Sequence, residues 1–359
     1  MLASKENKEG ISKFTNPVSI KSFQQKRKAT IDAADLVKSV LNKSISALSR
    51  AITLIESNNP THQEKANYII NGCLPFANKS IRIGITGVPG VGKSTFIETL
   101  GNHLILQGKK VAVLAVDPSS TVSKGSILGD KTRMENLAKN PKAFIRPSAS
   151  GNTLGGVAKK TRETIILCEA AGFDVIIIET VGVGQNETTV ASMVDFFLLL
   201  KLAGAGDELQ GIKRGIIEMA DAIVINKADG DNLKTANLAK VEFSRALHYY
   251  PKRASNIEPQ IFTCSALNNT GITDVWEAIL SYVKTTKANH FFQEKRNEQD
   301  KYWLIQTIEN QLKTTFFNSP KIKHALQEQL SLIKQQRTTP FAAANYILNL
   351  DEKTANNHG

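Results

Sequence analysis

The sequence predicts an α/β fold in which a mostly parallel sheet is flanked by helices, and two patterns indicate it. Short runs rich in Val, Ile and Leu recur along the middle of the chain, at 80–86, 111–116, 173–179, 195–200, 222–225 and 260–264. Stretches with apolar residues at helical spacing separate some of these runs, which is typical of a parallel sheet with helical crossovers. Residues 79–284 are therefore expected to form one domain built on this sheet.

The first run leads into a phosphate-binding loop. Residues 87–94 read GVPGVGKS, which matches the pattern G-x-x-x-x-G-K-S/T between a strand and a helix predicted over 95–106. Glycines let such a loop turn its N–H groups toward phosphate oxygens, and the positive end of the helix adds to that field. Lys93 is expected to reach the β- and γ-phosphates of a nucleoside triphosphate, and Ser94 to place its hydroxyl on Mg²⁺. The residues predicted to bind the phosphates are Gly87, Gly90, Val91, Gly92, Lys93, Ser94 and Thr95.

The identity of the base is predicted from a motif that follows the run 222–225. Residues 226–229 read NKAD, an N-K-x-D pattern, in which Asp229 can accept the N1–H and the exocyclic amino hydrogens of guanine. Adenine lacks this pair of donors, so ATP would leave a buried carboxylate unpaired. Lys227 would lie along the base, Asn226 would connect this loop to the phosphate loop, and a backbone N–H after 260–264 would meet the guanine carbonyl. The residues predicted to bind the base of GTP or GDP are Asn226, Lys227, Asp229, Ser265, Ala266 and Leu267.

The two motifs together are typical of a P-loop GTPase, and three carboxylates are candidates for its Mg²⁺ site. Glu179 ends the run 173–179 and forms E-x-x-G with Gly182, where most GTPases have D-x-x-G. Its longer side chain can still hold Mg²⁺, directly or through water, and Gly182 lets the backbone approach the γ-phosphate and move away after hydrolysis. Asp117 ends a strand beside the nucleotide, while Asp130 could be a ligand or could cap a helix over 132–139. The predicted metal ligands are Ser94, Asp117, Asp130 and Glu179.

The segment from Leu202 to Lys213 is a candidate switch loop. It follows an apolar strand and has three glycines within 204–211, which permit the backbone to rearrange with the γ-phosphate. An ordinary strand-to-helix connection capped by Asp207 is the alternative. Gln185, just after the E-x-x-G turn, could position the attacking water or could hydrogen-bond the backbone.

Composition argues against several other classes of protein. The 359 residues carry a formal net charge of +12, but most basic residues are dispersed along predicted helices, so no nucleic-acid partner is expected. Residues 1–29 are expected to form a basic, disordered tail; an organellar targeting peptide is the alternative, although two Glu and a single Arg are the wrong composition for one. The three scattered cysteines favour reduced thiols in a cytoplasmic protein. The six histidines form no pair at metal-ligand spacing, and no apolar stretch reaches membrane-spanning length.

A helical extension is expected over 30–78. One apolar stripe predicts a long amphipathic helix with Thr30 as its N-cap, and a second helix is expected from Pro60 to about Asn71. The stripe consists of Val37, Leu41, Ile45, Leu48, Ile52 and Ile55.

Residues 285–359 are expected to form a second helical region. Two apolar stripes are separated at 318–320 and the second ends before Pro340. They consist of Ile305, Ile308, Leu312 and Phe316, and of Ile322, Leu326, Leu330 and Ile333. With Trp303 and Phe317, these helices either pack back on the core or form an arm for homodimerisation, which we favour because a short appendage cannot bury so much apolar surface on itself.

Six stretches of the sequence together resemble one family, the methylmalonyl-CoA mutase-associated GTPases of the MeaB/ArgK/MMAA group. The resemblance runs from about residue 30 to about residue 350, and it is specific because GTPases at large share only the phosphate loop and N-K-x-D. The matching stretches are 84–90, 115–120, 125–134, 179–185, 203–213 and 339–343.

The resemblance implies a GTP-hydrolysing switch that acts as chaperone and gatekeeper for a cobalamin-dependent acyl-CoA mutase of the methylmalonyl-CoA mutase type. By resemblance, nucleotide binding, Mg²⁺ binding and hydrolysis depend on Lys93, Asp117, Asp130 and Glu179. The loop 202–213 resembles the family's extra switch, with Lys213 a candidate for balancing charge in the transition state, and the C-terminal helices resemble a dimerisation arm. The resemblance implies no function for residues 1–29.

Two other functions are alternatives. A nickel metallochaperone-type GTPase would need Cys or His near the switches, and residues 180–215 contain neither. An ATP-dependent kinase of a transport protein would need a site for adenine, and the N-K-x-D motif argues against one.

Overall fold

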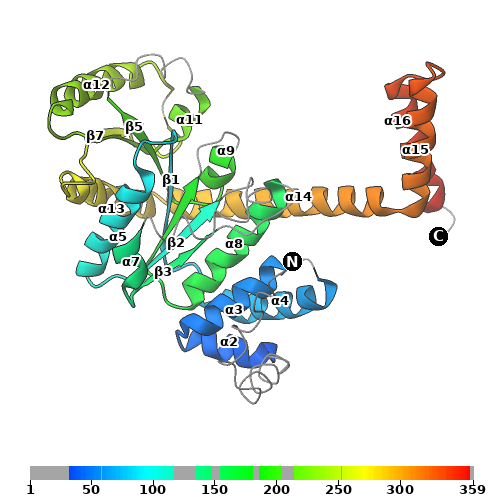
Figure 1. Ribbon diagram of the computed structural model, residues 1–359, viewed down its shortest axis with the longest axis horizontal. Helices are drawn as coiled ribbons and strands as arrows, with labels where there is room; N and C mark the ends of the chain where they lie inside the picture. The colour runs from blue at the N-terminus through cyan, green and yellow to red at the C-terminus, as the bar shows by residue number, and fades with distance from the viewer. Residues whose placement is uncertain are drawn as a thin grey trace, which may run out of the picture.

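A computed structural model gives the arrangement of the chain (Figure 1) and describes residues 32–57, 59–116, 134–147, 154–180, 186–203, 214–251 and 253–355. Four residues of the predicted site lie outside these ranges, namely Asp117, Asp130, Gly182 and Lys213. The basic tail 1–29, Thr30 and Gln185 also lie outside them.

The centre of the molecule is a parallel sheet of seven strands in the order β3-β2-β4-β1-β5-β6-β7. The strands are β1 (Ile81–Gly87), β2 (Val111–Val116), β3 (Ala143–Arg146), β4 (Val175–Thr180), β5 (Phe196–Leu202), β6 (Ala222–Asn226) and β7 (Gln260–Thr263). The predicted α/β fold is therefore confirmed, with β3 as a strand that the sequence patterns did not reveal. Five strands are buried along almost their whole length, because helices cover both faces of a parallel sheet.

Alternate residues of the strands point into two separate cores, one on each face of the sheet. On one face, side chains such as Ile83 and Ile177 pack against α5, α7 and α13. On the other face, side chains such as Ile176 and Ile223 pack against α8, α9, α11 and α12. The helices around the sheet are α5 (Lys93–Leu106), α7 (Glu135–Lys139), α8 (Leu154–Ala170), α9 (Asn186–Ala191), α11 (Arg214–Met219), α12 (Asn232–Leu247) and α13 (Ile272–Ala288).

The N-terminal extension packs against α8 as three helices (Figure 1), and the predicted single long helix is wrong. The helices are α2 (Ala33–Leu41), α3 (Ile45–Glu56) and α4 (Pro60–Cys73), followed by a short 3₁₀ turn. The chain turns between α2 and α3, where Lys43 has a φ of 65° and Ser44 caps α3 by accepting from the Ala47 N–H at 3.4 Å. The side chain of Asp32 caps α2.

The C-terminal helices form an arm that extends away from the sheet (Figure 1). The first part of α14 (Phe291–Asn318) packs on the central domain, and its Trp303 is buried in the core and donates to the carbonyl oxygen of Ser192, so this side chain is not part of an exposed apolar surface of the arm as predicted. Beyond Trp303, apolar side chains of α14 are exposed at Leu304, Ile305, Ile308 and Leu312. At the far end, α15 (Pro320–Lys334) and α16 (Pro340–Ala355), a helix that the sequence analysis did not predict, share a small core.

Two further observations concern membrane-spanning helices and the cysteines. Within the described ranges, no helix combines the length and the apolar character that crossing a membrane requires. The three cysteines, Cys73, Cys168 and Cys264, are free thiols and all are buried.

Candidate active site

The phosphate loop lies at the carboxyl end of β1, between the strand and α5. A Cβ atom at Gly87 would lie 2.6 Å from the carbonyl oxygen of Leu200 in β5. Gly92 has a φ of 92°, and a Cβ there would lie 2.8 Å from Nδ2 of Asn226. Both positions therefore require glycine, because a side chain would collide with the neighbouring strand or with the base loop.

Lys93 is the first residue of α5 and its side chain is folded into the phosphate loop. Its Nζ donates hydrogen bonds to the carbonyl oxygens of Gly87 at 2.8 Å and of Val88 at 3.3 Å. Burial lowers the pKa of Lys93, while the carboxylates of Glu179 and Glu187 act in the opposite direction. The loop thus holds a cation beside backbone N–H groups at a helix N-terminus, an arrangement suited to binding phosphate.

The predicted metal ligands Ser94 and Glu179 face each other. Ser94 Oγ donates to Glu179 Oε1 at 3.5 Å, and Glu179 is only 7% exposed at the end of β4. The next residue, Thr180, shares a hydrogen bond of 2.8 Å between its hydroxyl and that of Thr86 at the end of β1. A hydroxyl and a carboxylate side by side are hard oxygen ligands, so these residues fit Mg²⁺. β2 ends at Val116 opposite Thr180, so both strands end at the same level of the sheet, and the next residue, Asp117, lies outside the described ranges.

Asn226 joins the loops that follow β1, β6 and β7, which are predicted to surround the nucleotide. Its Nδ2 donates to the carbonyl oxygen of Val91 in the phosphate loop at 2.8 Å. Its Oδ1 accepts from the N–H of Ala266 at 3.3 Å, and the hydroxyl of Thr99 on α5 donates to the carbonyl of Ala266 at 2.9 Å. Asn226 is 2% exposed, so these bonds are shielded from water and fix the loops relative to one another.

The residues predicted to bind the base gather at the carboxyl ends of β6 and β7. Ser265 Oγ donates to Asp229 Oδ2 and accepts from the N–H of Asn268 at 3.2 Å, which orients the carboxylate. Lys227, with a φ of 59°, and Leu267 are exposed beside it. The half-buried Asp229 carboxylate, which the Ser265 hydroxyl orients, can accept hydrogen bonds from two donors of guanine.

The structure also reveals residues near the site that sequence reasoning missed. Glu187 is 6% exposed in the first turn of α9. Its carboxylate, like that of Glu179, raises the pKa of Lys93 against the larger lowering by burial. Thr86 and Thr180 join the ends of the paired strands β1 and β4 through their hydroxyl groups, and Thr86 directly precedes the phosphate loop. The signal for Thr180 was its position next to Glu179, whereas no motif spacing marks Glu187.

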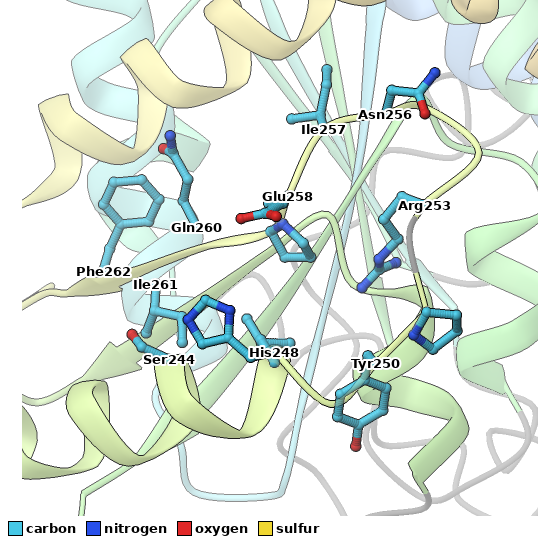
Figure 2. A pocket seen from close by; sticks show the side chains of 13 residues that line it. Ser244, His248, Tyr250, Arg253, Asn256, Ile257, Glu258, Gln260, Ile261 and Phe262 are labelled. Carbon is cyan, nitrogen blue, oxygen red and sulfur yellow. The ribbon is translucent and has the colours of Figure 1, made fainter.

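A cavity of about 750 Å³ lies between the end of α12, the loop that follows it and β7 (Figure 2). It is lined by His248 at the end of α12, by Arg253 and Glu258 in the following loop, and by Phe262 of β7. The guanidinium of Arg253 donates to two carbonyl oxygens at the end of α11, at 2.8 and 3.0 Å. The cavity is therefore separate from the predicted nucleotide site, because it lies at the start of β7, whereas Ser265 and Ala266 follow the end of that strand.

The phosphate loop follows the central strand β1, and the N-K-x-D loop follows β6, two strands away, at the same carboxyl ends of the sheet. This arrangement makes the protein a P-loop GTPase. Its family within that class follows from comparison with known proteins. The family model described as "Methylmalonyl Co-A mutase-associated GTPase MeaB" matches residues 48–321, and the chain belongs to this family. The predicted family and GTPase activity are thereby confirmed.

Relatives and a solved structure agree with this assignment. A probable GTPase of Mycobacterium tuberculosis (strain H37Rv) is 48% identical over 308 residues, 86% of this chain and 92% of the relative. GTPase ArgK of Escherichia coli (strain K12) is 45% identical over 293 residues, 82% and 88% of the two chains. The mitochondrial methylmalonic aciduria type A homolog of Mus musculus is 42% identical over 311 residues, 84% and 75% of the two chains. The crystal structure of a LAO/AO transport system kinase superposes with a TM-score of 0.72 at 36% identity, covering 89% of this chain and 97% of the other.

Proposed function

We propose that this GTPase acts as chaperone and gatekeeper for a cobalamin-dependent acyl-CoA mutase of the methylmalonyl-CoA mutase type. The observation that carries the proposal is the family match over residues 48–321, since the description of that family names association with this mutase. The name of the 42% identical mouse relative, a methylmalonic aciduria type A homolog, supports the same client.

The nucleotide cycle is proposed to use GTP and GDP with Mg²⁺ held by Ser94 and Glu179, and by Asp117 and Asp130 outside the described residues. When bound, the ion would neutralise charge on the phosphate oxygens. Lys93 would exchange its bonds to the loop carbonyls for bonds to the β- and γ-phosphates. Asp229 would accept the guanine donors, while Asn226 keeps the phosphate and base loops in register.

The partner-responsive parts are proposed to be the segment 202–213 and the arm. The segment begins at the last residue of β5 and contains Lys213, which would stabilise charge that develops only in the transition state. The arm would form a homodimer, because Ile305, Ile308 and Leu312 are 46%, 50% and 64% exposed along one helix.

The test is stimulation of GTP hydrolysis by the client. The full chain is mixed with a purified cobalamin-dependent acyl-CoA mutase of the same organism, and phosphate release is followed with GTP and Mg²⁺. We expect the mutase to raise GTP turnover, with mutase alone and the Lys93→Ala variant as controls. If no such mutase changes the rate or forms a complex, the client assignment is wrong and a GTPase without a known client remains.

A further inference from the structure

The first part of α14 is bound to a short segment that leads away from the nucleotide site. We call residues 192–195, which join α9 to β5, the connector, and residues 295–303 of α14 the root of the arm. α9 begins directly after 181–185, which contains the E-x-x-G glycine, and β5 leads into 203–213. The connector therefore lies between the two segments that are predicted to respond to the γ-phosphate.

Two side chains of the root hold carbonyl groups of the connector. Trp303 Nε1 donates to the carbonyl oxygen of Ser192 at 3.2 Å. Gln299 Nε2 donates to the carbonyl oxygen of Val194 at 2.8 Å. Trp303 and Gln299 are 8% and 6% exposed, so water does not compete effectively for these bonds.

The end of the connector is anchored more firmly than its beginning. The Asp195 carboxylate accepts from Nε and Nη2 of Arg296 at 2.8 and 2.7 Å, and from the N–H of Arg82 in β1 at 2.8 Å. Its carbonyl oxygen accepts from Lys295 Nζ at 2.8 Å. Asp195 is thus fixed to both the sheet and the root, and a displacement of α9 would be taken up by residues 192–194.

α9 is short and closely seated on the sheet. Val190 of α9 and Val194 of the connector pack over Gly84 of β1, where a Cβ would lie 3.0 Å from each. A helix of six residues is about 9 Å long, so α9 acts as a short rigid link between 181–185 and the connector.

Two features indicate that this contact has a second arrangement. Gln299 Oε1 is buried and has no hydrogen-bond partner within the part of the chain that the structure describes, which is costly in a static contact. A groove of about 420 Å³ lies between the connector and the root, lined by Ala191, Ser192, Phe291 and Tyr302. The connector therefore has room to shift.

We propose that Gln299 and Trp303 are positioning residues for GTP hydrolysis. They hold α9 through the connector, and so couple the arm to the helix that begins directly after residues 181–185. Because such coupling is reciprocal, the presence of the γ-phosphate changes the contact between the connector and the root of the arm. This inference concerns the GTPase itself and does not depend on the identity of its client.

The first test uses the two tryptophans, Trp276 and Trp303, as reporters. The full chain is labelled with 5-fluorotryptophan, and its ¹⁹F spectrum is compared with GDP and with a non-hydrolysable GTP analogue, both with Mg²⁺. Trp303→Phe, or Trp276→Phe if the first variant does not fold, assigns the two resonances. The Trp303 resonance should differ between the two nucleotides, while that of Trp276, bonded to Gln107 in the other core, should not. An unchanged Trp303 resonance overturns the proposal.

The second test measures coupling with matched variants of α14. Gln299→Met keeps the length of the side chain but removes the donor to Val194, and Gln306→Met changes a glutamine whose amide bonds Glu309 at the surface. Gln299→Met should change the ratio of GTP-analogue to GDP affinity by about fivefold or more, the lower end of usual coupling. Gln306→Met should leave the ratio as in the unmutated protein. Equal ratios in the two variants contradict a positioning role, since a merely structural defect would weaken both nucleotides alike.

Discussion

Asn226 Nδ2 lies 2.8 Å from the carbonyl oxygen of Val91, 135 residues earlier in the chain. This hydrogen bond joins the base loop to the phosphate loop, and Gly92 makes room for it because any Cβ there would lie 2.8 Å from the same nitrogen. One buried side chain therefore connects the loops that are predicted to bind the phosphates and the base.

The first prediction concerns this connection. Asn226→Ala should weaken GTP and GDP alike by on the order of tenfold, because it leaves the Val91 carbonyl and the Ala266 N–H unpaired in a buried site. Calorimetric titration measures both affinities. Asn237→Ala, at an exposed position of α12, is the matched control. Unaltered affinities for Asn226→Ala would show that the loops are held together by other contacts.

Base specificity should depend on Asp229. Asp229→Asn should reduce GTP affinity by on the order of 10⁴-fold and favour xanthosine nucleotides, because the amide can donate where the carboxylate accepts. The Ser265 hydroxyl that bonds Asp229 can reverse its role and accept from the new amide, so the fold should persist. Competition binding with GTP, ATP and XTP measures the change. Equal binding of ATP and GTP by the unmutated protein would refute this assignment.

Hydrolysis should depend on the carboxylate beside Ser94. Glu179→Ala, and likewise Asp117→Ala, should lower GTP turnover at least about tenfold at saturating Mg²⁺ while the melting temperature stays close to that of the unmutated protein. Removing Mg²⁺ with EDTA should have the same effect on the unmutated chain. Glu135→Ala, which loses only an exposed pair with Lys139, is the control. Full turnover in either site variant would exclude that residue from the metal site.

The arm should control oligomeric state. Leu312→Glu places a charge on an apolar side chain that is 64% exposed, and should convert a homodimer into monomers without lowering basal GTP hydrolysis. Light scattering coupled to size-exclusion chromatography measures the mass. Lys313→Glu, a charge change at the neighbouring exposed position, should leave the dimer intact. A monomeric unmutated protein would contradict the dimer proposal directly.

The buried thiols should be unreactive and should link stability to alkaline pH. Burial raises the pKa of Cys73 from 9.0 to about 11, so the unfolded chain loses this proton at a lower pH than the folded one. The contribution of Cys73 to stability should therefore be complete below pH 9 and be lost as the pH rises toward 11. Denaturant titrations between these values, compared with Cys73→Ala, measure the slope. Rapid alkylation of all three thiols of the native protein at pH 8 would disagree with their burial.

Much of the fold was predictable because local patterns carry it. Buried parallel strands are apolar along nearly their whole length, so six of the strands were evident, and β3 was missed because only Phe144 and Ile145 are buried in it. The turn between α2 and α3 was not evident, because apolar residues recur at helical spacing on both sides of Lys43 and Ser44. The positive φ of Lys43, which ends α2, cannot be read from that spacing.

The sequence by itself determined the chemistry of the site, because phosphate and guanine recognition depend on residue types at set spacings after strands. Only the tertiary structure decided which residues meet: that Asn226 bonds Val91, that Ser94 faces Glu179, and that Trp303 at the root of the arm bonds Ser192 just after α9. These contacts join parts of the chain that lie tens to more than a hundred residues apart. The order of the strands in the sheet and the path of α14 decide which of these residues come into contact. The spacing of residues along the chain reveals neither of them.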